Sequence, residues 1–231
     1  MLRHGIVAAT LLLSGCIGHG ATGPIANERR LVELDKADLT RVRLKMSAGE
    51  LDVRGGAATL AEADFAYNVP EWKPVLTHSV NGSESQLEIS QGDGPTVFGD
   101  TENRWRLALN DERPIDLNAH LGAGEARMKL GSLHLKNVEM HVGTGEADID
   151  LRGNPAESYR VQIHGGVGSA TVRVPATVAI SATASGGLGS INVSGLEQRD
   201  GHWINPRAES SPVKIDLDVR GGIGEIRIVA E

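Results

Sequence analysis

A short phrase built around Gly-x-Gly recurs along the second half of the chain at nearly even steps. The three clearest copies are HLGAGEARMKL at 120–130, HVGTGEADIDL at 141–151 and HGGVGSATVRV at 164–174. Counted between first glycines, five copies are separated by 21, 23, 21 and 35 residues, and SAGELDV at 47–53 is a degenerate earlier copy. Repeats of this length are typical of a solenoid, in which each unit buries its apolar face only against its neighbours.

The phase of the apolar residues indicates strands and not helices. In each copy, apolar side chains stand five and three residues before the first glycine, such as Leu117 and Ala119, and four and six residues after it, such as Ala126 and Met128. This period of two on both sides is the pattern of strands. We therefore predict an all-β, single-domain β-solenoid, similar to a β-helix, with coils of about 21 residues in which two strands meet at a Gly-x-Gly corner.

Glycine suits such a corner because a sharp bend often needs a positive φ or a close approach of two backbones, which a Cβ would obstruct. A nucleotide-binding Gly-x-Gly would need a helix after it, whereas a second strand follows each copy here, so a phosphate site is not expected. The predicted structural corners are Gly122, Gly124, Gly143, Gly145, Gly166, Gly168, Gly187, Gly189, Gly222 and Gly224.

The N-terminus has the pattern of an export signal. The segment MLRHGIVAATLLLSGC combines a basic start at Arg3, an apolar run over 6–13 and small residues before Cys16. Its end resembles the lipobox of bacterial lipoproteins, which implies a signal peptide over 1–16 and lipidation of the Cys16 thiol. The alternative is an ordinary signal peptide or a buried strand with a chance cysteine, but the chain has no other cysteine. A flexible, Gly-rich tether is expected over 17–29.

Residues 30–231 are predicted to form the solenoid, with 57–116 as its irregular first part. Within this part, PVLTHSVNGSESQLEIS predicts a hairpin around Asn81-Gly82, and RWRLAL resumes the alternation. A separate N-terminal domain is the alternative, but no linker composition marks a boundary. The longest step between copies contains LEQRDGHWINPRAE at 196–209, which we interpret as a polar excursion with turn signals.

Composition narrows the choice of partners and the kind of core. The formal net charge is −7 and no basic stripe with interleaved aromatics is present, which argues against a nucleic-acid partner. Aromatic residues make up 3% of the chain, so we expect thin layers of Val, Leu, Ile, Met and Ala. With a single cysteine, the exported domain depends on packing and not on disulfides.

Six segments follow one another in an order that is typical of one family. They are GELDVRGGAATLAEADFAYN, WKPVL, GAGEARMKLGSLHLKNVEMHVGTGEADIDLRG, GGVGSATVRVP, GGLGSINVSGL and SPVKIDLDVRGGIGEIRI. Together they resemble the bacterial toast-rack domain family, which is similar to the extracytoplasmic part of cell-wall-stress regulator proteins and to adhesin-like domains. The resemblance covers roughly 30–231 and implies a β-solenoid on the envelope side of the membrane, with no established chemistry. The transmembrane helices of some relatives have no counterpart here, so a lipid anchor would replace them.

The sequence contains few motifs that indicate a catalytic or metal site. The sequence has no His-Glu-x-x-His, Cys-x-x-Cys or Gly-x-Ser-x-Gly. Asp148 and Asp150 could be compared with the paired acids of carbohydrate-cleaving β-helix enzymes. Stacked coils would instead place Arg127 beside Asp148, and Lys129 and Arg173 on either side of Asp150, an alternation of charge that stabilises strand register. We therefore expect no catalytic residue, no cofactor and no enzyme activity.

One outward-facing position of the repeat is occupied by histidine in three successive copies. His120, His141 and His164 stand two residues before the first glycine in three successive copies. If the coils stack in register, the three imidazoles lie on one face at about 4.8 Å spacing. They are weak candidates for a shared divalent metal or for a strip whose members repel on protonation. A solvated ladder without a function is the favoured interpretation, because zinc sites usually need a third or fourth ligand and the next copies offer Ser185 and Arg220.

Two functional classes remain open from the sequence. The favoured one is a lipid-anchored extracytoplasmic β-solenoid that acts as a non-catalytic interaction or scaffold module of the bacterial cell envelope, in envelope-stress response or adhesion. The other is a carbohydrate-cleaving or carbohydrate-binding β-helix protein, which would need a deep cleft with convergent acids. The expected partners are the membrane, through lipidated Cys16, and an unidentified envelope protein or glycan. Ile17 stands where an Asp would resemble an inner-membrane retention signal, so the outer membrane is expected if the host has one, and otherwise the outer face of the cytoplasmic membrane.

Overall fold

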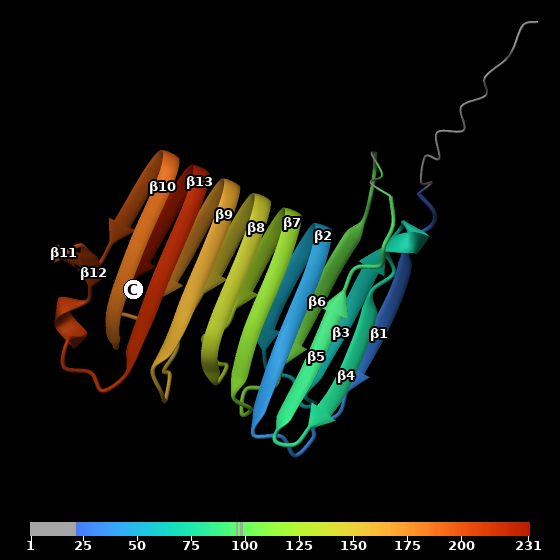
Figure 1. Ribbon diagram of the computed structural model, residues 1–231, viewed down its shortest axis with the longest axis horizontal. Coiled ribbons are helices and arrows are strands. Elements are labelled where there is room, and N and C mark those ends of the chain that lie inside the picture. The colour runs from blue at the N-terminus through green and yellow to red at the C-terminus, as the bar shows by residue number, and fades with distance from the viewer. Residues whose placement is uncertain (1–21, 96, 98) are drawn as a thin grey trace, which may run out of the picture.

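The structure, a computed structural model, describes residues 22–95, 97 and 99–231, which form one continuous β-sheet of 13 strands (Figure 1). The predicted all-β solenoid is confirmed. The only helical elements in these ranges are two short 3-10 helices, η1 (Pro70–Trp72) and η2 (Pro206–Ala208). In the part of the chain that is described, no helix is long and apolar enough to cross a bilayer. The predicted signal peptide, Cys16 and the start of the tether lie outside the described residues.

Six long, U-shaped strands form the body of the solenoid. They are β2 (Leu39–Gly55), β7 (Ile115–Lys129), β8 (Leu135–Asp150), β9 (Tyr159–Val174), β10 (Ala179–Ser194) and β13 (Lys214–Ala230). Each is one coil, with a first arm before the Gly-x-Gly corner and a second arm after it, and strand pairing continues through the bend. Neighbouring coils are parallel and in register, so the corner glycines lie opposite one another. The two arms of a coil are therefore parts of a single bent strand.

The two glycines of a corner are needed for different reasons. The second glycine has φ between +130° and +139° at Gly124, Gly145, Gly168, Gly189 and Gly224, a region that L side chains rarely adopt. The first glycine has no positive φ, but a Cβ on it would meet the backbone of the neighbouring coil; on Gly187 it would lie 2.6 Å from the carbonyl oxygen of Gly222. The second glycine thus permits both the bend and the close stacking of bends, whereas the first is needed for the stacking alone.

The hydrophobic core fills the space between the two arms. In β7, Leu117 and Ala119 on the first arm and Ala126 and Met128 on the second arm are each at most 1% exposed. The chain returns from one coil to the next through short segments that also bury apolar side chains, among them Leu130. A layer this thin has room for few aromatic rings, which explains the low aromatic content.

At the N-terminal end, separate strands continue the two arms beyond β2. On the first arm, β5 (Glu84–Ser90) pairs with β2 and then with β4 (Val75–Asn81), which is joined to β5 by the predicted hairpin. On the second arm, β6 (Asn103–Leu109) pairs with β2, followed by β3 (Ala61–Tyr67) and β1 (Ala26–Val32). Here the aromatic residues gather, with Phe65 packed edge-on against Trp105 at a centroid distance of 5.5 Å.

The structure corrects the C-terminal limit of the predicted tether at 17–29. Residues 26–29 belong to β1, which pairs with β3 along its whole length. The polar sequence of this strand hid it, because β1 lies at the edge of the sheet and only its last residue, Val32, is buried. The backbone is also held just before β1, where the Gly23 N–H donates to the Asn68 carbonyl at 2.6 Å.

At the C-terminal end, the stack departs from sequence order. The last coil in the sequence, β13, lies between β9 and β10, so that β10 ends the stack. The polar excursion at 196–209 forms a small hairpin of β11 (Glu197–Arg199) and β12 (His202–Ile204), which turns at Asp200-Gly201 and covers the β10 edge at Ser181 and Ala182. The 35-residue step between the last two repeats therefore contains the hairpin that pairs with β10. After this hairpin the chain returns to form β13 between β9 and β10.

Candidate functional site

The three predicted histidines form a stacked column on the outer face of the first arms. His120 of β7, His141 of β8 and His164 of β9 are directly paired in the parallel ladder. Their rings are 4.6 Å and 4.7 Å apart between centroids, with interplanar angles of 5° and 11°. The register expected from the repeat therefore brings the imidazoles face to face.

Two cations extend this column at its ends. Lys45 of β2 is paired with His120, and Arg220 of β13 is paired with His164. Ser185 follows Arg220 only one coil further on, because β13 is inserted before β10. The cations are not isolated: Lys45 contacts Glu88 at 2.8 Å and Arg220 contacts Asp218 at 2.6 Å. We call the set Lys45, His120, His141, His164 and Arg220 the histidine column.

The surroundings of the histidine column favour neutral imidazole at one end and an ionised carboxylate beside it. Partial burial, followed by repulsion from His141, lowers the pKa of the His120 imidazole below its ordinary 6.5. Glu139 Oε1 lies 2.8 Å from His141 Nε2, and Glu139 also accepts a hydrogen bond from Asn118 at 2.8 Å. The bond to His141 is the main cause that lowers the pKa of the Glu139 carboxyl below its ordinary 4.5.

The stacking does not present the three imidazoles as a metal chelate. The ligating lone pairs of an imidazole lie in its ring plane, and nearly parallel rings aim them side by side and not at a common point. Within the described ranges, no group of three or more His, Cys, Asp or Glu side chains is placed to hold a metal ion. A shared metal would require the rings of the histidine column to rotate out of their stack.

The two acids that could be compared with a glycosidase pair are bound by arginines. Strand register places Asp148 beside Arg127, and Asp150 between Lys129 and Arg173, as the repeat predicts. Asp148 forms an ion pair with Arg173, and Asp150 accepts bonds from Arg152 at 2.6 Å and 2.9 Å. The Arg152 hydrogen bond is the main cause that lowers the pKa of the Asp150 carboxyl. A carboxyl that is held ionised does not suit the role of a general acid.

A second surface feature, which the repeat analysis missed, lies on the outside of the corners. Val167, Ile223 and Leu188 occupy the middle position of Gly-x-Gly in β9, β13 and β10, and they are 49%, 53% and 69% exposed. They are consecutive in the ladder and form an aliphatic strip, which we call the corner ridge. In β7 and β8 the same position holds the smaller Ala123 and Thr144, so the ridge is confined to the last three coils of the stack.

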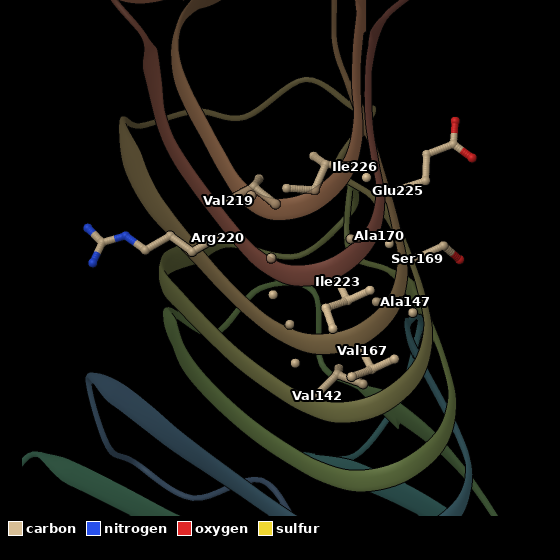
Figure 2. Close-up of a pocket in the computed structure, with 18 of the residues that line it drawn as sticks. Val142, Ala147, Val167, Ser169, Ala170, Val219, Arg220, Ile223, Glu225 and Ile226 are labelled. Carbon is tan, nitrogen blue, oxygen red and sulfur yellow. The ribbon is translucent and has the colours of Figure 1, made fainter.

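Beneath the corner ridge lies a small apolar cavity of about 70 Å³. Figure 2 shows Val219 and Ile226 between the arms, with Arg220 and Glu225 pointing away on opposite sides of the bend. The cavity exists because Gly165, Gly186 and Gly221 stand where Leu121 and Val142 fill the corners of β7 and β8. The sequence signal was a third glycine before the motif, as in GGVG, GGLG and GGIG.

These features define a class of protein: an all-β solenoid with extended outer faces of stacked, mostly ion-paired side chains and an aliphatic strip at one end. The chain belongs to the toast-rack family, because the sequence profile of the N-terminal domain of toast_rack (DUF2154) matches residues 21–173.

Among solved structures, the chain is similar to that of a "putative cell adhesion protein" from Clostridium sporogenes ATCC 15579. The two are 30% identical, with a TM-score of 0.83 over 90% of this chain and 100% of that chain. A "putative adhesin" from Bacteroides fragilis NCTC 9343 matches 88% of this chain and 96% of its own, but at 10% identity and a TM-score of 0.29 it is too distant to bear on function. No curated protein matches the sequence.

Proposed function

We propose that this protein is a lipid-anchored, non-catalytic interaction module on the extracytoplasmic side of the bacterial cell envelope, with a role in adhesion. The observation that carries the proposal is the likeness, along the whole length of the domain, to the "putative cell adhesion protein" of Clostridium sporogenes. The envelope location also agrees with the family to which the chain belongs.

The arrangement of the strands supports an interaction role. β1, which follows the expected anchor in the sequence, and β10 lie at opposite ends of the stack, eight strand spacings or about 38 Å apart. An anchor before β1 would hold one end at the membrane and leave the far end for a partner. The outer faces between them are regular and built from ion pairs such as Arg173–Asp148 and Lys45–Glu88, which suits a scaffold and not a catalytic cleft.

Cell attachment tests this proposal directly. A host strain that lacks the gene should attach less to surfaces or cells than the parent strain, and the full chain supplied on a plasmid should restore attachment. A chain with Cys16→Ala, which cannot be lipidated, should be made but should not restore attachment. Equal attachment by the parent and the deletion strain would contradict the adhesion role.

An envelope-stress role is a distinct outcome of the same strains. The family resemblance supports it through the cell-wall-stress regulators, and it would appear as altered survival under cell-wall antibiotics with unchanged attachment. That result would retain the interaction module and replace adhesion by stress response.

A further inference from the structure

The last strand of the stack, β10, presents an open sheet edge. One edge of β10 is fully paired with β13 from Ala179 to Ser194, but the other edge is paired only at Ser181 and Ala182, with β12. Among the residues that the structure describes, no strand pairs with this edge over 183–194. An open edge of this length offers a row of backbone N–H and C=O groups to another chain.

This edge also lacks the charges by which proteins usually protect open strands. The sequence of β10, AISATASGGLGSINVS, contains no Asp, Glu, Lys or Arg, and it is the only one of the six U-shaped strands without them. At the opposite end, the edge strand β1 carries Glu28, Arg29 and Arg30, whereas the other edge strand, β4, also has no Asp, Glu, Lys or Arg but covers only seven residues of one arm. Leu188, which is 69% exposed, and Ile191, which is 42% exposed, add aliphatic surface to the open edge. Uncharged, partly apolar edges favour strand addition.

The corner geometry specifies what a strand added here must contain. At each contact between coils, the place where a glycine would carry its Cβ faces a carbonyl of the preceding coil, as Gly222 faces Gly166 and Gly187 faces Gly222. By the same repeat, β10 offers the carbonyls of Gly187 and Gly189 to whatever strand comes next. A strand that follows β10 around the bend therefore needs glycine at both corner positions.

The neighbouring residues favour two further features of an added strand. Gly186 leaves the corner cavity unfilled, whereas Leu121 and Val142 fill the equivalent space in earlier coils. An aliphatic residue just before the incoming Gly-x-Gly would fill the space beside Gly186. An aliphatic residue between the two glycines would extend the corner ridge past Leu188.

A second copy of this chain does not fit the edge through its own β10. The β11–β12 hairpin continues the sheet beyond the first arm of β10. Two β10 edges brought to the strand spacing of about 4.8 Å by a two-fold axis run antiparallel, first arm against second arm, so each hairpin would occupy the place of the other copy's second arm. A single extended segment meets no such obstacle over the corner and the second arm.

The geometry points to strand addition at this end of the solenoid: residues 186–194 of β10 bind an extended segment of another envelope protein that carries an aliphatic residue followed by Gly-x-Gly. The segment lies parallel to β10 and forms the next coil of the stack. This inference rests on the proposed interaction role and names the chemistry of the partner.

A peptide that copies β8, residues 135–150, serves as the probe. It has Val142 before its Gly-x-Gly, and one lysine with four acidic residues gives it a net charge of −3. The labelled peptide is titrated with the full chain in detergent, and fluorescence anisotropy reports binding. We expect saturable binding, and none for the same peptide with Gly143→Val and Gly145→Val.

Two lysine variants locate the binding site. Leu188→Lys places a charge at the β10 edge and should weaken binding at least about tenfold. Electrostatic attraction between the added lysine and a peptide of charge −3 would strengthen binding, so weaker binding cannot be a charge effect. Ala123→Lys places the same charge at the equivalent position of β7, where both edges are paired, and should leave binding unchanged. Both positions are exposed, so the melting temperatures of the two variants should equal that of the parent.

Three results would overturn the inference: no binding of the β8 peptide, equal binding to the Leu188→Lys variant, or a concentration-dependent dimer of the full chain that Leu188→Lys abolishes. The last would assign the edge to self-association. All three results are measured with purified protein. The adhesion role is tested separately by the attachment of whole cells, so this inference can fail while the proposed function holds.

Discussion

At the scale of single residues, the corner glycines carry most of the information that the sequence holds about the fold. Their spacing predicted the length of one coil. Their positive φ and their close contacts with the next coil explain why glycine recurs at each corner. Gly145 combines a φ of +135° with a Cβ direction that faces the neighbouring backbone, so it meets both requirements at once. Thr144, between Gly143 and Gly145, is exposed and meets neither.

The first prediction concerns this contrast. Gly145→Val should lower the free energy of unfolding by more than about 1 kcal/mol, because a β-branched residue is strained at positive φ and would collide with Gly124. Thr144→Val, which introduces the same side chain one residue away, should change it by less than about 0.5 kcal/mol. Urea denaturation measures both. Similar losses for the two variants would contradict the corner explanation.

The second prediction concerns the histidine column and pH. Because the pKa of His120 in the folded chain lies below its ordinary 6.5, the unfolded chain binds more protons, and stability should fall as the pH drops below 6.5. The lowered pKa of Glu139 acts in the same sense at more acidic pH, below 4.5. The groups that face His120 are Lys45 and Arg43 of β2 and Glu139 and His141 of β8.

Replacing His120 by Gln removes the titration and keeps a polar side chain in the stack. Melting temperatures between pH 5 and 7 should therefore change less for His120→Gln than for the parent. His202→Gln, in β12 and outside the histidine column, serves as the control and should follow the parent. A parent profile that is flat across this range would show that the column does not couple protonation to folding.

At the scale of strands and turns, the structure is held by register more than by any single contact. The β4–β5 hairpin follows from Asn81-Gly82, where Gly82 has φ +61°, and the β11–β12 hairpin follows from Asp200-Gly201. The order of the last coils could not be predicted in the same way. All coils are parallel and share one glycine pattern, so any of them could lie beside any other, and the choice depends on loop reach and on the cap over β10.

Engineered cysteine pairs test that order. Gln162 of β9 and Asp218 of β13 are direct partners in the ladder, so Gln162→Cys with Asp218→Cys should form a disulfide under mild oxidation. Gln162→Cys with Thr183→Cys joins coils that are adjacent in sequence but separated by β13, and it should not. Mass spectrometry of peptides from the non-reduced protein reads both results. A disulfide only in the second pair would mean that the coils stack in sequence order.

The candidate site, too, could be predicted from the sequence only where it follows from the repeat pattern. The histidine column was predictable because one slot of the repeat holds His120, His141 and His164. Its Arg220 end was not predictable, since Arg220 reaches His164 only through the insertion of β13 between β9 and β10. The corner ridge was missed because Val167 and Leu188 fall in a position that earlier copies fill with small residues, and exposure there depends on the three-dimensional bend.

At the scale of the whole molecule, the two ends of the stack are built differently. At the N-terminal end, separate short strands continue the two arms and end in the unpaired edges of β1, which carries charged residues such as Arg29, and of β4, with the aromatic cluster around Trp105 between the arms. The C-terminal end leaves most of the β10 edge unpaired within the described chain. An anchor before β1 would leave the long β10 edge at the far end of the stack, where a partner strand can reach it.

The last prediction tests whether the N-terminal end is the end that is held at the membrane. Cys16→Ala should move the protein from the membrane fraction to the soluble fraction, because acylation of the cysteine would supply the hydrocarbon that partitions into the bilayer. Gly18→Ala, a small change that keeps the cysteine, should leave the protein in the membrane fraction. Both variants are compared after a wash at high salt, which removes proteins held only by charge. If the Cys16→Ala protein still sediments with washed membranes, lipidation of Cys16 is not what holds the protein there.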